Sequence, residues 1–213
     1  TNGAVIADLK TNKAIRTCGL SNEMVQRILN IAKKYHSATD PFIDGRAITQ
    51  PSSIDHMDEF GLSPQMQKLI RDTREVVPDV MEYVKTTGAQ AEKINIFMAD
   101  LEEREILRRE LMAMPELSIS SSMYNNLEVN AKGADKGSAL LWLADHLGIS
   151  REETMAFGDG ENDIPMIKAA GIGVAMENAL DTVKEAADTI TLNNDEDGVA
   201  AAIRKFIFGS SEE

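Results

Sequence analysis

Residues 155–179 read Met-Ala-Phe-Gly-Asp-Gly-Glu-Asn-Asp-Ile-Pro-Met-Ile-Lys-Ala-Ala-Gly-Ile-Gly-Val-Ala-Met-Glu-Asn-Ala, and this stretch decides the fold. A short apolar run over residues 154–157 stops at a glycine, a helical pattern covers residues 164–168, and a second apolar run covers residues 172–176. A proline near the start of the helical pattern and a glycine just past its end are typical helix boundaries. The order strand, tight turn, helix, strand predicts two neighbouring strands of a parallel sheet.

The turn between the first strand and the helix carries Asp159, Asn162 and Asp163. In open α/β sheets the functional crevice lies at the carboxyl ends of the strands, which is where this turn falls. Two carboxylates four residues apart are oxygen ligands that suit Mg²⁺, and the start of the following helix favours an anion beside the metal. The turn therefore predicts a site for magnesium and phosphate. A solvated acidic surface turn is the alternative that the spacing alone leaves open.

The amino-acid sequence of this stretch resembles the last motif of haloacid dehalogenase superfamily phosphatases, in the Cof-like sugar-phosphatase group. The matching residues are Gly158-Asp159-Gly160-Glu161-Asn162-Asp163, Met166, Gly171-Ile172-Gly173-Val174-Ala175-Met176, Asn178-Ala179, Ala187-Asp188 and Asp195-Glu196-Asp197-Gly198-Val199. Upstream, Ala134-Asp135-Lys136-Gly137 resembles the lysine motif of the same family, at the start of a predicted helix. The two motifs together are far more specific than either alone.

Composition narrows the possible partners of the chain. It has 213 residues with 35 acidic and 22 basic side chains, a net charge of −13, which argues against nucleic acid or an anionic membrane as a partner. The single cysteine, Cys18, excludes an internal disulfide. No run approaches the 18 or so apolar residues of a membrane span, so we expect a soluble cytoplasmic protein.

The rest of the chain is predicted to alternate between short strands and helices. We expect hairpins within residues 4–17 and 41–49, helices from Ser21 and around 65–71, 79–85, 101–112 and 137–146, and strands at 94–98, 117–122 and 127–130. The later part has the βαβ rhythm of a parallel sheet, so we expect a domain boundary near residue 125.

The resemblance implies an α/β fold in which a Rossmann-like core carries a large α/β cap. Residues 1–125 would then be the cap, and residues 126–213 the C-terminal part of the core. Family members open with an Asp-x-Asp pair, whose first aspartate is the nucleophile, and this chain has no such pair after an apolar strand. The sequence Asp195-Glu196-Asp197 matches a different family position. We therefore expect a fragment that is inactive without the missing segment.

The resemblance also implies roles for five residues. Asp159 would bind Mg²⁺ directly, and Asp163 would hold a metal-bound water or orient the lysine. Lys136 would stabilise charge on the nucleophile and on the phosphoryl group during transfer. Asn162 would bind substrate phosphate, and Asn194 is a candidate for the same role, although its Asn-Asn-Asp loop is also ordinary turn chemistry. The expected substrates are small phosphorylated metabolites such as sugar phosphates.

Two other functions are compatible with parts of the sequence. If the short chain is the natural product, it would be a non-catalytic module that binds a cation or a ligand. Cation-pumping P-type ATPases carry a similar Gly-Asp-Gly-x-Asn-Asp pattern, but the absence of a membrane span and of their phosphorylation sequence disfavours them. The histidines His36, His56 and His146 show no metal-ligand spacing, so we expect them to be exposed or hydrogen-bonded.

Overall fold

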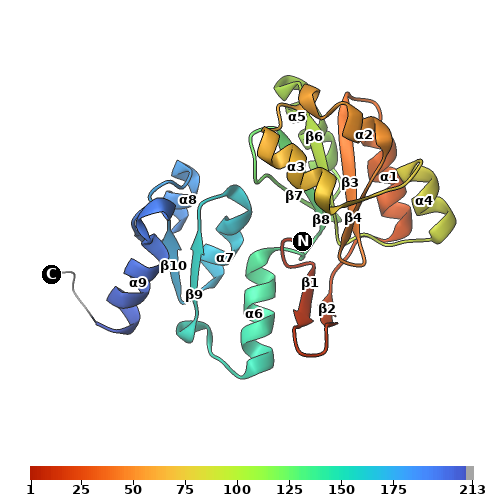
Figure 1. The fold of residues 1–213 in the computed structure, drawn as a ribbon. Coiled ribbons are helices and arrows are strands. Elements are labelled where there is room, and N and C mark those ends of the chain that lie inside the picture. The colour runs from red at the N-terminus through yellow and green to blue at the C-terminus, as the bar shows by residue number, and fades with distance from the viewer. Residues whose placement is uncertain (210–213) are drawn as a thin grey trace. The chain divides into compact units, whose positions relative to one another are not determined.

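The computed structural model of the chain describes residues 1–209, and the chain divides into two compact units. The N-terminal unit is Thr1–Ala134, and the C-terminal unit begins at Asp135 (Figure 1). The division falls later than the boundary expected near residue 125, because strand β8 (Asn126–Ala131) pairs with β6 and β7 of the N-terminal unit. The resulting α/β architecture agrees with the sequence-based expectation.

The N-terminal unit opens with the predicted hairpin. Strands β1 (Val5–Asp8) and β2 (Lys13–Thr17) pair antiparallel, with a register irregularity after Ile6. At the turn, the Asp8 carboxylate accepts the backbone N–H of Lys10 at 2.8 Å, which is the local hydrogen bond that favours aspartate in tight turns.

A six-stranded mixed sheet forms the centre of this unit, in the order β5-β4-β3-β6-β8-β7. Only the β4/β5 pair is parallel. The further strands are β3 (Ser37–Ile43), β4 (Arg46–Thr49), β5 (Arg74–Val76), β6 (Lys93–Met98) and β7 (Leu117–Ser120). The helices are α1 (Asn22–Ala32), α2 (Pro51–Asp55), η1 (Met57–Phe60), α3 (Pro64–Thr73), α4 (Val80–Thr87) and α5 (Leu101–Met112).

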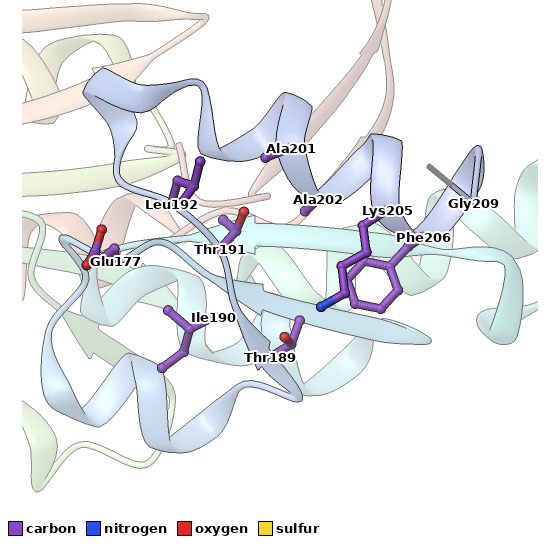
Figure 2. A pocket seen from close by; sticks show the side chains of 10 residues that line it. All are labelled: Glu177, Thr189, Ile190, Thr191, Leu192, Ala201, Ala202, Lys205, Phe206 and Gly209. Carbon is purple, nitrogen blue, oxygen red and sulfur yellow. The ribbon is translucent and has the colours of Figure 1, made fainter. Parts of the chain in front are cut away.

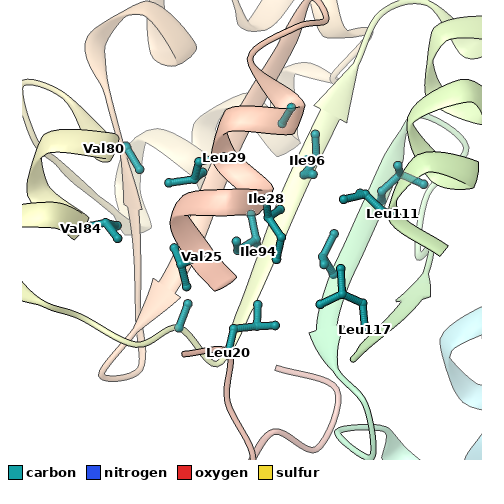
Figure 3. Packing of buried hydrophobic residues seen from close by; sticks show 14 of the residues in the cluster. Leu20, Val25, Ile28, Leu29, Val80, Val84, Ile94, Ile96, Leu111 and Leu117 are labelled. Carbon is teal, nitrogen blue, oxygen red and sulfur yellow. The ribbon is translucent and has the colours of Figure 1, made fainter. Parts of the chain in front are cut away.

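One face of this sheet packs against α1, α4 and α5 to form the main core (Figure 3). Ser21 caps α1 by accepting the backbone N–H of Met24 at 3.3 Å, as its position before the apolar stripe predicts. The buried residues of α1 are the four with the predicted spacing, namely Val25, Ile28, Leu29 and Ala32. They meet Ile94 and Ile96 of β6, whose side chains point to the same face because strand side chains alternate.

The opposite face of the sheet is more polar. Lys93 donates to Glu128 at 2.7 Å, and Arg74 donates to Asp40 at 3.0 Å, with all four side chains mostly buried. Burial alone would raise the pKa of Glu128, but attraction to Lys93 and hydrogen bonds outweigh it and lower that pKa below its ordinary value. Burial raises the pKa of Asp40, although Arg74 opposes the shift. These two ion pairs therefore respond differently to acid.

The C-terminal unit contains the predicted parallel sheet, in the order β11-β10-β9. Its strands are β9 (Met155–Gly158), β10 (Ile172–Ala175) and β11 (Thr189–Ile190). Its helices are α6 (Lys136–Leu147), η2 (Arg151–Glu153), η3 (Glu161–Asp163), α7 (Ile164–Ala169), α8 (Asp181–Ala186), η4 (Asn194–Glu196) and α9 (Gly198–Ile207). Since all three strands run in the same direction, the loops after them meet at one edge of the sheet. Within residues 1–209, no helix is long and apolar enough to cross a bilayer.

Candidate active site

The candidate site is built on the turn that follows β9. Strand β9 ends at Gly158, and Asp159 and Gly160 lead directly into η3. The carboxylate of Asp163 folds back over this turn, where its Oδ2 accepts the backbone N–H groups of Asp159 and Gly160 at 3.1 Å each. The last residue of η3 therefore closes the loop that precedes it, which explains how so short a turn holds a fixed shape.

Lys136 reaches this turn from α6. Asp135 caps the helix by accepting the backbone N–H of Ser138 at 2.8 Å, which fixes where α6 starts and so where Lys136 lies. The Lys136 ammonium forms an ion pair with Oδ1 of Asp163, 27 residues away in the sequence. Asp163 is only 6% exposed, and both of its oxygens have protein partners. Its carboxylate therefore supports the turn and orients the lysine.

Two glycines make this close assembly possible. A Cβ atom on Gly137 would lie 2.3 Å from the backbone oxygen of Pro165, and a Cβ atom on Gly158 would lie 2.3 Å from the Cβ of Asp163. No side chain fits at either distance without movement of its neighbours. The first glycine lets α6 approach α7, and the second lets Asp163 pack against the end of β9. Each glycine belongs to one of the two quoted motifs, but roles were predicted only for the charged residues and Asn162 in those motifs.

Asp159 is the carboxylate that is available to a ligand. Its side chain is exposed, and it makes no ion pair with any of residues 1–209. Its backbone is held on both sides, because its N–H binds Asp163 and its carbonyl accepts the backbone N–H of Leu180 at 3.2 Å. Its carboxylate Oδ2 accepts a hydrogen bond of 3.3 Å from the side-chain amide of Asn178.

Asn178 also connects Asp159 with the loop after β11. The side-chain oxygen of Asn178 accepts the backbone N–H of Asn194 at 2.9 Å. The predicted residue Asn194 is therefore two hydrogen bonds from Asp159, and its own side chain is exposed. Asn162 lies in the same turn, with its side-chain oxygen 3.1 Å from where a Cβ on Gly160 would be. Asn178 is among the matching residues quoted above, but no role was predicted for it, although its place after the second strand was a usable signal.

The donor groups suit a hard divalent cation such as Mg²⁺. Magnesium is usually bound by one or two protein carboxylates, with water and substrate phosphate completing its coordination. The exposed carboxylate of Asp159 meets that requirement, and the Lys136 ammonium, paired with Asp163, adds a positive group to the same turn. Across the described part of the chain, no group of three or more His, Cys, Asp and Glu side chains is arranged to hold a metal by itself. The donor set therefore fits a metal that shares its coordination with a ligand.

A cavity of about 670 Å³ lies elsewhere in the C-terminal unit, between β11 and α9 (Figure 2). Its lining is largely apolar, with Ile190, Leu192 and Phe206 at its walls, and Glu177 and Lys205 as its charged residues. None of the five predicted site residues lines it. The cavity has a single carboxylate, that of Glu177, among its lining residues, and it lies apart from both quoted motifs, so we place the candidate site at the acidic turn.

Residues 1–203 match the sequence model of a family described as haloacid dehalogenase-like hydrolase. The chain is 50% identical to the 5-amino-6-(5-phospho-D-ribitylamino)uracil phosphatase YcsE of Bacillus subtilis over 114 residues, which are 52% of the chain. It is 36% identical to a second B. subtilis protein named 5-amino-6-(5-phospho-D-ribitylamino)uracil phosphatase, YwtE, over 151 residues, which are 71% of the chain. These matches cover 46% and 48% of the relatives, so the chain spans about half their length.

Solved structures match almost the entire chain. A haloacid dehalogenase-like hydrolase from B. subtilis aligns with a TM-score of 0.83 and 28% identity, over 97% of this chain and 77% of the other. The subclass IIB sugar phosphatase BT4131 aligns with a TM-score of 0.76 and 27% identity, over 96% of this chain and 73% of the other. The α/β fold is therefore that of the subclass IIB structures over most of the chain.

Proposed function

The chain belongs to the haloacid dehalogenase-like hydrolase family, within its Cof-like subclass IIB group, and on that premise we propose that its acidic turn serves a Mg²⁺-dependent phosphatase. The reaction would be the hydrolysis of phosphoric monoesters of small metabolites such as sugar phosphates. The observation that carries the proposal is the Lys136–Asp163 ion pair, which brings an ammonium group to the turn that presents Asp159 at the carboxyl end of β9.

Each predicted residue has a distinct part in this proposal. Asp159 would hold Mg²⁺, which when bound would neutralise charge on the phosphoryl oxygens. Lys136 would offer its ammonium to the phosphoryl group as negative charge develops there, while Asp163 keeps it in place. Asn162 and Asn194 would donate hydrogen bonds to the substrate phosphate. The carboxylate of Asp163 would orient the lysine and hold the turn, so the position of the Lys136 ammonium and the shape of the turn would depend on the same side chain.

The nucleophile would be an aspartate outside these 213 residues. Its carboxylate oxygen would attack phosphorus as the bond to the ester oxygen breaks, and a second aspartate would donate a proton to that oxygen. Water would then hydrolyse the aspartyl-phosphate and release inorganic phosphate. In this proposal the C-terminal unit is the later part of the core and the N-terminal unit is the cap. The 213-residue chain alone would not turn over substrate.

The relatives narrow the substrates that should be tried first. Two B. subtilis relatives carry the name 5-amino-6-(5-phospho-D-ribitylamino)uracil phosphatase, and one structural relative is a sugar phosphatase. A phosphorylated polyol chain on a heterocycle and a sugar phosphate share a phosphate ester on a polyhydroxylated carbon chain. We therefore propose that class of substrate for the complete protein.

The test is an activity assay on the chain together with whatever sequence is encoded upstream of Thr1. We expect this longer polypeptide to release phosphate from p-nitrophenyl phosphate and from the metabolite panel only with Mg²⁺, and Asp159→Ala to abolish the release. Turnover that persists without Mg²⁺ and in Asp159→Ala would overturn the proposal. Cation binding at the turn with no turnover by any longer form would instead favour a non-catalytic binding module.

A further inference from the structure

The side chain of Asn178 uses both ends of its amide at the candidate site. Its Nδ2 donates to Oδ2 of Asp159 at 3.3 Å, and its Oδ1 accepts the backbone N–H of Asn194 at 2.9 Å. Asn178 lies between β10 and α8, whereas its two partners follow β9 and β11. One amide therefore joins the loops after all three strands of the C-terminal sheet.

The chemistry of the two partners fixes the orientation of this amide. A backbone N–H can only donate, so it requires the carbonyl oxygen of Asn178, and an ionised carboxylate can only accept, so it requires the amide nitrogen. Aspartate at this position would turn a negative oxygen toward Asp159, and alanine would lose both contacts. Of the side chains of this size and shape, only asparagine offers a donor on one side and an acceptor on the other.

We propose that Asn178 is a positioning residue that orients the Asp159 carboxylate for a divalent cation. It holds Oδ2 and leaves Oδ1 without a protein partner among residues 1–209. This inference rests on the proposed function, in which Asp159 is the metal ligand. Carboxylates that bind metals are themselves hydrogen-bonded, and loss of such a partner typically lowers metal affinity by about 10- to 100-fold.

A second consequence concerns the loop after β11. The same amide holds the backbone of Asn194, and the backbone N–H of Glu177 donates to the carbonyl of Leu192 at 3.4 Å beside it. A cation that fixes the Asp159 carboxylate would therefore also restrain the loop that presents Asn194. The residue acts through its neighbours, so we assign it positioning and no contact with the reacting atoms.

The experiment is a calorimetric titration of Mg²⁺, repeated with Mn²⁺, into the 213-residue chain and three variants. Asn178→Ala removes the proposed support, and Asp159→Ala removes the proposed ligand. Asn193→Ala is the matched control, because Asn193 stabilises the same loop through Asp195 and Glu196 and none of its hydrogen bonds reaches Asn178 or Asp159. We expect Asn178→Ala to bind the cation about tenfold more weakly, at the low end of the usual range, because the hydrogen bond from Asn178 to Asp159 is long. We expect unchanged cation affinity in Asn193→Ala.

The outcomes separate this inference from the function on which it rests. Unchanged affinity in Asn178→Ala with lost binding in Asp159→Ala would overturn the role of Asn178 alone. Equal weakening in both asparagine variants would also overturn it, because a general loosening of the loop would explain the result. Unchanged binding in Asp159→Ala would refute the metal assignment itself.

A measurement on the unmodified chain covers the case in which Asn178→Ala does not fold. Addition of Mg²⁺ should shift the ¹⁵N NMR signals of the Asn178 side-chain NH₂ together with the backbone amide of Asp159. If the Asp159 amide shifts while the Asn178 side-chain signals stay in place, the proposed hydrogen bond does not respond to the cation, and the inference fails.

Discussion

Gly137→Ala would place one methyl group in the contact between α6 and α7. The added Cβ would lie 2.3 Å from the backbone oxygen of Pro165, 2.6 Å from its carbonyl carbon and 3.1 Å from the nitrogen of Met166. Ordinary contacts begin at 3.4 Å, so α6 and α7 must separate by about 1.1 Å (3.4 − 2.3). All three atoms belong to the backbone, so no side-chain rotation can relieve the clash.

Two effects of opposite sign compete in this variant. Alanine favours the helix and reduces the entropy of the unfolded chain, which would stabilise the protein by about 0.4–1 kcal/mol. Overpacking of a well-packed contact costs typically about 1–3 kcal/mol. Because rigid backbone is involved, we expect the clash to win, with a net loss of about 1–2 kcal/mol in the free energy of unfolding.

The assay is urea unfolding followed by fluorescence of Trp142, the single tryptophan of the chain. This residue lies on α6 and stacks on His146 with ring centroids 4.9 Å apart, so its signal reports on the C-terminal unit. Gly160→Ala is the control, since its Cβ would meet side-chain atoms and no backbone: Oδ1 of Asn162 at 3.1 Å and Oδ2 of Asp163 at 3.8 Å. A Gly137→Ala variant as stable as the unmodified chain, or more stable, would refute the close packing of α6 on α7.

Three further predictions concern other contacts. Asp163→Asn should lower the unfolding free energy by about 1–3 kcal/mol, because a charge-assisted hydrogen bond to Lys136 is lost, and the same fluorescence assay would show no change if the ion pair is absent. Glu128→Gln should make stability depend less on acid. Because the pKa of Glu128 is lowered in the folded state, its contribution to the free energy of unfolding is complete above the ordinary value of 4.5 and is lost as pH falls through the folded-state pKa. Acid titrations followed by circular dichroism should therefore differ between the variant and the unmodified protein. Identical acid profiles would count against the Lys93–Glu128 pair. Ser21→Ala should cost about 1 kcal/mol through the lost cap of α1, measured by thermal unfolding, and a cost near zero would contradict the cap.

Local patterns in the sequence predicted much of the fold. The spacing of apolar residues after Ser21 predicts the buried stripe of α1. The stretch from residue 155, whose glycines and proline mark the element boundaries, predicts β9, α7 and β10, with the two strands parallel. These features depend on neighbours within a few residues, which propensity and periodicity describe well. The charged motif residues Lys136 and Asp163 form an ion pair, while their roles in a reaction stay predictions.

Contacts between distant segments could not be predicted in the same way. Glu59 accepts hydrogen bonds from both His36, at 2.6 Å, and His56, at 2.8 Å, although no spacing in the sequence indicates this cluster. These hydrogen bonds lower the pKa of Glu59. The short strand β5 and helix α2 also escaped prediction, because β5 exists by virtue of its pairing with β4. For the Glu59 cluster and for β5, the tertiary partner, and not the local sequence, determines the structure.

The most direct test of the central claim is to map where Mn²⁺ binds on the 213-residue chain by paramagnetic broadening of its ¹⁵N NMR signals. The account predicts that broadening at low Mn²⁺ is strongest for the backbone amides of residues 158–163 and extends to Asn178 and Asn194. Broadening that is centred on another acidic segment, such as residues 195–197, and that leaves residues 158–163 sharp, would contradict it.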